Sequence, residues 1–317
     1  MSEDKVYDVI VIGAGAAGMT SAIYTCRKEL STLIIAPEVG GQTNLTSHIE
    51  NYPGFEEALA GWDLMSKFRK QAERFGAEFI TGKVTKVEKI AEHDFKVSTE
   101  DGKSLKSKSI MVAAGKVPRK LGVPGEDDFY GKGVSVCVTC DAPFYKEKIA
   151  AVVGGGNSAV EGALELSNIA TKVYLIHRRE EFRADEISID KIKANEKIEL
   201  LTNSEVKEIK GEQFVKSIKV MNNKDNSEKE IEVDGVFTEI GYIADTSFVE
   251  GVVDLNERKE ITIDSNNRTS QSGIFAAGDI TNVPYKQTVI SAGEGAKAAL
   301  ECYKYVTGHD LGDSVSK

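Results

Sequence analysis

Two cysteines three positions apart, in the segment Cys137-Val-Thr-Cys140-Asp141, are the residues of this chain best suited to chemistry. Only a thiolate attacks a disulfide, and a Cys-x-x-Cys arrangement can lower the pKa of one thiol through its neighbour and a nearby helix amino terminus. The carboxyl group of Asp141 is adjacent in sequence and could relay a proton to or from a departing thiolate. An amino-terminal cap for the following segment is the alternative role of Asp141. We take these three residues as the candidate catalytic set for thiol–disulfide exchange.

A zinc site is the other chemistry that a Cys-x-x-Cys pair supports. Structural zinc needs four ligands. The remaining cysteines, Cys26 and Cys302, have no matching spacing, and we expect them to pack in the interior. The histidines are scattered along the chain, at His48, His93, His177 and His309. We therefore expect no metal, and the cysteine pair favours redox chemistry.

Two glycine-rich turns flank the cysteine pair. The turn Gly13-Ala-Gly15-Ala-Ala-Gly18 follows an apolar run at 6–12 and precedes a helical stretch to about residue 27 and a strand at 32–35. The same order returns at 149–176, around Gly154-Gly-Gly156-Asn157-Ser158-Ala159. In such a βαβ unit the glycines permit a tight bend and a close backbone approach, and the helix amino terminus offers N–H groups to a pyrophosphate. The chain therefore predicts two dinucleotide sites.

The end of the second strand distinguishes these two sites. There an acid favours a free ribose 2′-hydroxyl, and an arginine favours a 2′-phosphate. Counting 23 residues from Gly13 leads to Ala36 and on to Glu38, whereas the same count from Gly154 leads to His177, Arg178 and Arg179, with Arg183 close behind. Forked guanidinium groups suit a phosphate dianion, so the second site predicts NADPH in preference to NADH. A solvated basic surface is the alternative.

The first site must then hold another dinucleotide, and FAD fits an electron path from a nicotinamide to a disulfide. Near the carboxyl terminus an apolar strand ends in Gly278-Asp279, where a carboxylate can accept hydrogen bonds from ribityl or ribose hydroxyls. A simple turn acid is the alternative for Asp279.

The order of the segments predicts how the domains are arranged. Segments rich in β-forming residues at 78–87, 95–99, 206–209 and 214–221 predict hairpins or meanders added to each βαβ unit. The chain crosses between lobes near Val117 and again near Ile243, and it ends with a helix from Ser291 to about Val306. We expect an α/β fold of two Rossmann-like, three-layer nucleotide-binding domains, the second inserted into the first. The expected bounds are 1–116 with 247–317 for FAD, and 117–246 for NADPH.

Composition and charge argue against nucleic-acid and membrane partners. The 317 residues carry a formal net charge of -10, and the basic residues are dispersed apart from the arginines near 180, which argues against a nucleic-acid surface. The apolar run at 9–12 is too short to span a bilayer, and the acidic amino terminus does not resemble a secretory leader. We expect a cytoplasmic protein without membrane or nucleic-acid partners.

On these motifs the chain resembles the low-molecular-weight thioredoxin reductases over nearly its full length. The resemblance covers both glycine turns, the cysteine motif, the arginine motif and the segment around Gly278. By this resemblance the FAD-binding residues are Gly13, Gly15, Ala16, Ala17, Gly18, Glu38, Gly41, Gln42, Asn51, Ala114, Gly115, Gly278, Asp279, Lys286, Gln287 and Thr288. The NADPH-binding residues are Gly154, Gly156, Asn157, Ser158, His177, Arg178, Arg179 and Arg183.

The resemblance implies an NADPH-dependent disulfide reductase that passes electrons from NADPH to FAD, to the cysteine pair and to thioredoxin or a thioredoxin-like protein. It also implies a homodimer in which Cys140 faces the flavin, Cys137 exchanges with the partner and Asp141 is the acid. One domain is expected to rotate against the other, with hinges near Val117 and Ile243. The chain departs from the family pattern at Val138, at Ala142-Pro143 and at Lys286, where the family often has alanine, a glycine and arginine.

The sequence leaves three alternatives open. A peroxide-system reductase related to the large alkyl hydroperoxide reductase subunit would normally bring an amino-terminal thioredoxin-like domain, and only twelve residues precede Gly13. A flavin dithiol oxidase would hand electrons to oxygen without needing an arginine-rich nucleotide motif. A non-catalytic flavin or NADPH sensor would report oxidation through its cysteines without turnover.

Overall fold

The computed structural model describes residues 5–46 and 49–309. The chain forms two compact units, one made of Met1–Val117 and Ile243–Lys317 and the other of Pro118–Tyr242. No helix in the described ranges is long and apolar enough to cross a membrane. The first four residues, part of the acidic start noted above, and His48 lie outside the described residues.

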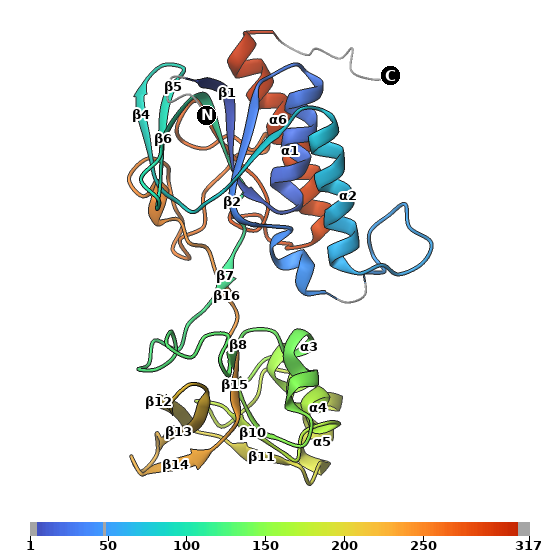
Figure 1. Ribbon diagram of the computed structural model, residues 1–317, viewed down its shortest axis with the longest axis vertical. Coiled ribbons are helices and arrows are strands. Elements are labelled where there is room, and N and C mark those ends of the chain that lie inside the picture. Colours follow the sequence, from blue (N-terminus) through green and yellow to red (C-terminus); the bar gives the residue numbers. More distant parts are fainter. Residues whose placement is uncertain (1–4, 47–48, 310–317) are drawn as a thin grey trace. The chain divides into compact units, whose positions relative to one another are not determined.

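The first unit is built on a seven-stranded sheet covered by helices (Figure 1). Its parallel strands are β1 (Val6–Ala14), β2 (Thr32–Val39), β3 (Glu78–Thr81), β6 (Ser104–Val112) and β17 (Ile274–Ala276), and β4 (Val84–Ala91) and β5 (Asp94–Thr99) extend it in antiparallel fashion from β6. The helices α1 (Ala16–Arg27), α2 (Gly61–Arg74) and α6 (Thr288–Thr307) lie together beside one face.

Alternation along β1 explains the layers of this unit. Successive side chains of a strand point to opposite faces, so Val9 and Val11 pack with the helices. Ile10 and Ile12 pack on the other face with Phe95 of the antiparallel strands. Because both faces of β1 are buried, the strand reads as one continuous apolar run, which is typical of a parallel sheet.

The second unit repeats this plan at smaller size (Figure 1). Its parallel sheet has the order β11-β10-β9-β15-β8, and the strands are β8 (Val134–Ser135), β9 (Ile149–Gly154), β10 (Lys172–Ile176), β11 (Ile198–Leu201) and β15 (Gly235–Glu239). The helices α3 (Val138–Asp141), α4 (Asn157–Ser167) and α5 (Glu186–Ala194) lie beside one face, and β12 (Ser204–Gly211), β13 (Val215–Asn222) and β14 (Glu228–Glu232) form an antiparallel sheet.

The same alternation operates on β9. Val152 packs with the helix side, whereas Ala151 and Val153 pack with the side of the antiparallel sheet. Each parallel sheet thus has a hydrophobic core on both faces, and the predicted α/β fold with two parallel-sheet nucleotide-binding units is confirmed.

Several segments differ from the sequence-based expectation. The β-rich segment at 78–87 is two strands with different partners, because β3 pairs with β2 and β4 pairs with β5. Strand β2 runs beyond residue 35 to Val39, which pairs with Ala14. The two chain crossings, β7 (Val117–Pro118) and β16 (Tyr242–Ile243), pair as a two-stranded sheet. Short 3₁₀ helices occur at Gly41–Leu45, Ala142–Tyr145 and Ser247–Val249.

Candidate active site

Cys137 and Cys140 form a disulfide at the start of α3 in the second unit. Cys137 caps this short helix, because its Sγ accepts a hydrogen bond from the Cys140 backbone N–H at 3.2 Å. Cys140 is exposed, whereas Cys137 is half-buried. The two cysteines therefore form a disulfide at an accessible place. Thiol–disulfide exchange with another protein requires this accessibility.

Contacts with neighbouring elements hold the cysteine turn in place. Val138 is buried, and a Cβ added to Gly162 of α4 would come within 2.8 Å of its methyl group, so the absence of a side chain at Gly162 lets the turn seat on the helix. The Ser135 hydroxyl accepts from the Cys137 N–H at 3.1 Å, and the Thr238 hydroxyl donates to the Ser135 carbonyl at 3.4 Å. The end of β15 thus supports the segment that carries the dithiol.

Glu239, the last residue of β15, adds a titratable group to this support. Burial raises the pKa of its carboxyl group to about 7, and the hydrogen bond from the Val138 backbone N–H opposes that rise. Near neutral pH this carboxyl group is therefore divided between its protonated and ionised forms.

Asp141 lies half-buried at the end of α3. Although it occupies the cap position of the following 3₁₀ helix, its side chain makes no capping hydrogen bond. Burial raises the pKa of the Tyr145 hydroxyl, and the charge of Asp141 adds to that effect. Its carboxylate is thus not used as a helix cap, and it stays a prediction as the acid beside the dithiol.

The glycines of the second turn are required by close contacts. A Cβ on Gly154 would lie 2.2 Å from the Glu239 carbonyl oxygen, and one on Gly155 would lie 2.2 Å from the His177 ring. Gly156 caps α4, and nothing lies within 4 Å of a Cβ added there. Two glycines therefore serve internal packing, and the third leaves open space where the helix begins.

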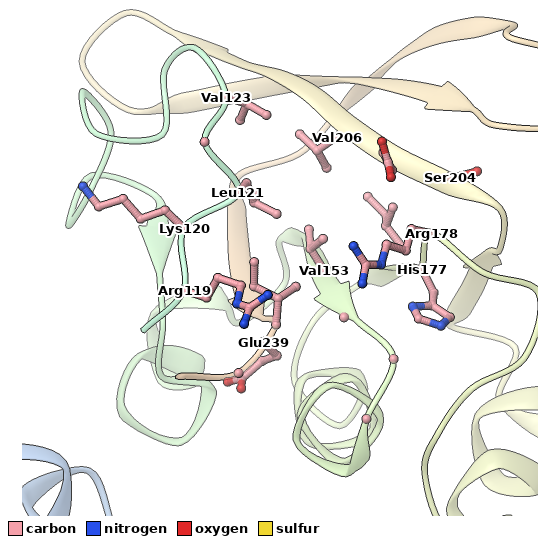
Figure 2. Close-up of a pocket in the computed structure, with 18 of the residues that line it drawn as sticks. Arg119, Lys120, Leu121, Val123, Val153, His177, Arg178, Ser204, Val206 and Glu239 are labelled. Carbon is pink, nitrogen blue, oxygen red and sulfur yellow. The ribbon is translucent and has the colours of Figure 1, made fainter. Parts of the chain in front are cut away.

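A cavity of about 790 Å³ opens at this turn, wholly within the second unit (Figure 2). His177 and Arg178 lie at one end, and Arg119 and Glu239 lie at the other. The charged and histidine side chains that line it are Arg119, Lys120, His177, Arg178, Arg179, Arg183, Glu205, Lys207 and Glu239. The cavity is thus predominantly basic, and its walls include all three glycines of the turn.

His177 organises the arginine loop. Its Nε2 is 3.1 Å from the Glu181 carbonyl, and its ring stacks on Phe182 with centroids 5.2 Å apart. Burial lowers the pKa of its imidazole, the Glu181 carbonyl opposes this, and the nearby arginines lower it further. The ring is therefore neutral at pH 7 and acts as a packing element, leaving the positive charge to the guanidinium groups.

Two backbone contacts tie this loop to the glycine turn. The Arg183 N–H donates to the Gly155 carbonyl at 2.6 Å. The Asn157 side-chain oxygen accepts from the Asp185 N–H at 2.8 Å. The three arginines consequently stand at a fixed place relative to the start of α4.

Most residues predicted to bind NADPH meet at this cavity. Those that line it are Gly154, Gly156, Ser158, His177, Arg178, Arg179 and Arg183. Asn157 is in the turn but does not line the cavity, because its side chain is engaged with Asp185. Sequence reasoning missed Arg119 and Glu239. A charged residue at the carboxyl end of a parallel strand, as at Glu239, was a signal that could have been used.

The glycines of the first turn show a similar division. A Cβ on Gly13 would lie 2.2 Å from the Ala113 carbonyl oxygen, and one on Gly18 would lie 1.9 Å from the Gly13 carbonyl oxygen. Gly15 caps α1, and a Cβ there would meet nothing within 4 Å. A Cβ on Gly41 would meet only the Gly15 Cα, at 3.9 Å. Open space therefore adjoins Gly15 and Gly41.

Other residues predicted to bind FAD come from loops at the carboxyl ends of the strands. The Gln42 side chain donates to the Lys116 carbonyl at 2.8 Å, and Asn51 donates to Gln287 at 3.2 Å. Thr288 begins α6, and Glu38 is exposed near the end of β2. Ala16, Ala17 and Gly18 belong to the first turn of α1, and Ala114 and Gly115 follow β6.

The segment after β17 is held by two acids, the predicted Asp279 and the buried Glu294, which sequence reasoning missed. Glu294 accepts a hydrogen bond from the Gly278 N–H at 2.9 Å, and burial raises the pKa of its carboxyl group. Asp279 accepts from the Ser291 hydroxyl at 3.2 Å. No local pattern marks Glu294, because its partner lies sixteen residues away on another element.

Lys286 belongs to a second buried charge cluster. Its Nζ donates to the Thr281 carbonyl at 2.6 Å and lies 3.8 Å from Glu260, which also pairs with Lys116 at 2.8 Å. Burial lowers the pKa of the Lys286 ammonium, and the carboxylate of Glu260 opposes that effect. The Lys286 side chain is thus held by protein groups, independently of any ligand.

The two remaining cysteines take no part in these sites. Cys302 is fully buried, and burial raises the pKa of its thiol to about 12, so it is not a nucleophile at neutral pH. Cys26 is half-buried, and burial also raises its thiol pKa. Among the residues that the structure describes, no group of three or more His, Cys, Asp or Glu side chains is placed to hold a metal ion.

Comparison with known proteins shows which family this chain resembles. The sequence profile described as pyridine nucleotide-disulphide oxidoreductase matches residues 7–296. The chain is 42% identical to a thioredoxin reductase of Listeria innocua over 307 residues, which cover 96% of this chain and 95% of that protein. It is 40% identical to the F subunit of an alkyl hydroperoxide reductase of Staphylococcus aureus over 301 residues, which cover 95% of this chain but 59% of that protein.

A solved structure agrees. The crystal structure of Lactococcus lactis thioredoxin reductase in its FR conformation superposes with a TM-score of 0.80 at 39% identity, covering 96% of this chain and 100% of that one. The chain therefore belongs to the pyridine nucleotide-disulphide oxidoreductase family. Within that family it groups with the low-molecular-weight thioredoxin reductases, and it is a flavoprotein oxidoreductase with a redox-active disulfide. Family membership implies FAD and a pyridine nucleotide.

Proposed function

We propose that this protein is an NADPH-dependent reductase of thioredoxin or a thioredoxin-like protein, in which electrons pass from NADPH through FAD to Cys137 and Cys140. The observation that carries the proposal is that one strand, β15, borders the basic nucleotide cavity and also supports the dithiol turn. The family assignment supplies the reaction class, and the basic lining of the cavity supports NADPH as the nucleotide.

The donor set of the cavity fits NADPH. Arg178, Arg179 and Arg183 line it beside the end of β10, where a ribose 2′-substituent is read in Rossmann-like units. Guanidinium groups bind a phosphate dianion through charge-assisted hydrogen bonds. Gly154, Gly156 and Ser158 would hold the pyrophosphate at the start of α4.

The first unit fits FAD by a similar test. Side chains are missing where a large group would need backbone contact, at Gly15 and Gly41, and the open space there would be filled by any Cβ. We assign FAD to residues 1–116 and 247–317 and the nucleotide to residues 117–246. When bound, the flavin supplies the ability to accept two electrons from a nicotinamide and to deliver them to a disulfide.

The chain's own residues would then carry out disulfide exchange. With the pair reduced, the Cys137 thiolate attacks a partner sulfur, forming a mixed disulfide and releasing a partner thiolate. Cys140 next attacks Cys137 Sγ, which restores the Cys137–Cys140 disulfide and frees the second partner thiolate. Asp141 exchanges protons with these sulfurs. We assign the exchanging role to Cys137 and the flavin-facing role to Cys140 by family resemblance.

Further parts of the proposal concern assembly and partner. We propose a homodimer that works in the reducing cytoplasm, with hinges near Val117 and Ile243. A disulfide protein of a peroxide-reducing system is the second candidate acceptor, because the similarity to the alkyl hydroperoxide reductase protein is nearly as high as that to the thioredoxin reductase.

The decisive experiment measures NADPH oxidation by the FAD-loaded protein against a panel of purified thioredoxin-like proteins. We expect turnover with at least one of them and bleaching of the flavin by NADPH under anaerobic conditions. Bleaching without turnover on any dithiol protein would contradict the reductase and favour a sensor. Rapid oxygen consumption with free dithiols and no bleaching by NADPH would favour a dithiol oxidase.

A further inference from the structure

Glu239 is unusual among the acidic residues of the nucleotide cavity. Glu205, the other acid of the cavity, pairs with Lys207 at 2.8 Å, and this ammonium group lowers the pKa of its carboxyl group. Glu239 is more deeply buried, and no salt bridge to it is found among residues 5–46 and 49–309. A buried carboxyl group in this position can gain or lose a proton, and so change its charge, during the reaction.

Sheet order locates Glu239 relative to the nucleotide. The arginines follow β10, which pairs with β9 on one side, whereas Glu239 ends β15, which pairs with β9 on the other. The glycine turn between them follows β9 itself. In a Rossmann-like unit the dinucleotide extends across this point, with its pyrophosphate at the turn and its two nucleosides on either side. An adenosine 2′-phosphate at the arginines therefore directs the nicotinamide towards the end of β15.

The cavity itself supports this placement. Arg119 and Glu239 lie at the end opposite His177 and Arg178 (Figure 2). The Glu239 carbonyl is close to Gly154, since a Cβ on that glycine would lie 2.2 Å from it. A nucleotide whose pyrophosphate is held at Gly154 thus has Glu239 among the next residues along its length.

We infer that Glu239 is a specificity-determining residue for the oxidation state of the nucleotide, favouring NADP⁺ when ionised and admitting NADPH when protonated. The inference rests on the proposed NADPH site. The oxidised nicotinamide ring carries a positive charge and the reduced ring carries none, so a carboxylate at this end attracts only the former. The pKa of about 7 places the change of charge in the physiological range.

The groups around Glu239 are consistent with this role. The side chains on neighbouring segments that carry charge or titrate are Arg119 in the cavity, Asp141 on α3, Glu161 on α4, and Tyr242 with Tyr130. Burial raises the pKa of the Tyr242 hydroxyl and the charge of Glu239 adds to this, so Tyr242 is neutral at pH 7. The disulfide does not titrate. Burial of the Glu239 carboxyl group thus places its own ionisation near neutral pH.

The test compares the affinities of the FAD-loaded, oxidised protein for three probes between pH 6 and 8, by calorimetry. The probes are NADP⁺, the redox-inactive 1,4,5,6-tetrahydro analogue of NADPH, and 2′,5′-ADP. Titration of the 2′-phosphate affects all three alike, so it cancels in the ratio of NADP⁺ to analogue affinity. We expect NADP⁺ binding to lower the pKa of the Glu239 carboxyl group, so that this ratio rises about five- to tenfold from pH 6 to pH 8.

Variants test whether Glu239 causes the pH dependence of this affinity ratio. Glu239→Gln should flatten the pH dependence of the ratio, and Glu239→Ala provides a second variant without a carboxyl group. Glu205→Gln is the matched control, since it removes an acid from the same cavity and should leave the pH dependence in place. A flat ratio in the unmodified protein, or a pH-dependent ratio that survives in a Glu239 variant, would overturn the inference. Failure of 2′,5′-ADP to bind would overturn the proposed nucleotide site, and the inference with it.

Discussion

The two glycine-rich turns share a backbone plan but differ in what their glycines touch. In the first turn Gly13 and Gly18 pack against backbone atoms of Ala113 and Gly13, so the contacts are internal to the sheet and helix. In the second turn Gly155 packs against the imidazole of His177, the residue that begins the arginine loop. The second turn therefore packs one of its glycines against the arginine loop, and the nearest contacts of Gly13 and Gly18 in the first turn include no such loop.

The two units also differ in how their acids are used. In the first unit Glu260 and Glu294 are committed to Lys116 and to the Gly278 N–H, so their role is structural. In the second unit Glu239 accepts from a backbone N–H and has a pKa near neutrality. Permanent anchoring in the first unit suits a resident cofactor. A titratable acid in the second suits a nucleotide that must enter and leave.

The largest expected effect distinguishes the second unit, which carries the cysteine pair, from the first unit, to which we assign the flavin. Replacing either Cys137 or Cys140 with serine should lower turnover with the protein substrate by about a thousandfold or more, because no exchange pathway remains. Bleaching of the flavin by NADPH should persist, since it needs neither sulfur. Steady-state and anaerobic stopped-flow measurements on both variants check this.

The same two variants test which sulfur faces the flavin. Cys137→Ser leaves Cys140 as the lone thiolate and should show a long-wavelength charge-transfer band. Appearance of the band only in Cys140→Ser would reverse the assigned roles. Cys26→Ser is a suitable control, because that cysteine lies in the first unit outside both sites.

The second prediction concerns the arginines that follow the second βαβ unit and that most clearly distinguish it from the first. The double variant Arg178→Ala with Arg179→Ala should raise the apparent Michaelis constant for NADPH by about a hundredfold, since each charge-assisted hydrogen bond contributes about 1.5–3 kcal/mol. The constant for NADH should change far less. Lys224→Ala is the control, because this exposed lysine pairs with Glu180 in the same unit. Equal losses for both nucleotides would refute the 2′-phosphate assignment.

The sequence revealed the two βαβ units because their signals are local. Apolar runs, glycines at fixed spacing and the end of the second strand all lie within a short stretch of chain, and the count from Gly154 to the arginines needs no structure. Arg178 and Arg179, which this count singled out, line the cavity. Helix α2 was overlooked although Leu64, Phe68 and Ala72 recur at helical spacing.

The rest depended on contacts between distant segments. That Asn157 holds Asp185 and does not line the cavity follows from a hydrogen bond across 28 residues. The Glu239 carboxyl group, at the end of β15, accepts a hydrogen bond from the Val138 N–H at the start of the distant helix α3. Neither contact has a local pattern, so the sequence alone could not show which polar residues are free to meet a ligand.

The third prediction uses glycines that adjoin open space in each turn. Gly15→Ala and Gly156→Ala meet no atom within 4 Å, so the stability of the ligand-free protein should change little. Affinity should fall by about tenfold, for FAD in the first variant and for NADPH in the second, because each added methyl group occupies space that the pyrophosphate needs. Thermal unfolding and ligand titration of the same preparations separate the two effects.

Gly18→Ala and Gly155→Ala provide the contrast. Each added Cβ would collide with protein atoms, at 1.9 and 2.2 Å, so these variants should lose about 1–3 kcal/mol of stability in their own unit before any ligand is added. If Gly15→Ala proved as destabilising as Gly18→Ala in the ligand-free protein, the division between packing and binding glycines would be wrong.

The smallest effect concerns the acid that sets the second unit apart. The folded-state pKa of Glu239 lies above the ordinary value of 4.5, so the folded protein binds this proton more tightly and its stability falls as pH rises from about 4.5 through about 7. Glu239→Gln retains an acceptor for the Val138 N–H and cannot ionise. It should therefore be more stable than the unmodified protein at pH 8, by about 1–2 kcal/mol once solvent screening is allowed for, with the difference disappearing towards pH 5. Urea unfolding at both pH values measures this difference, and a larger stabilisation at pH 5 than at pH 8 would contradict the assigned direction of the pKa shift.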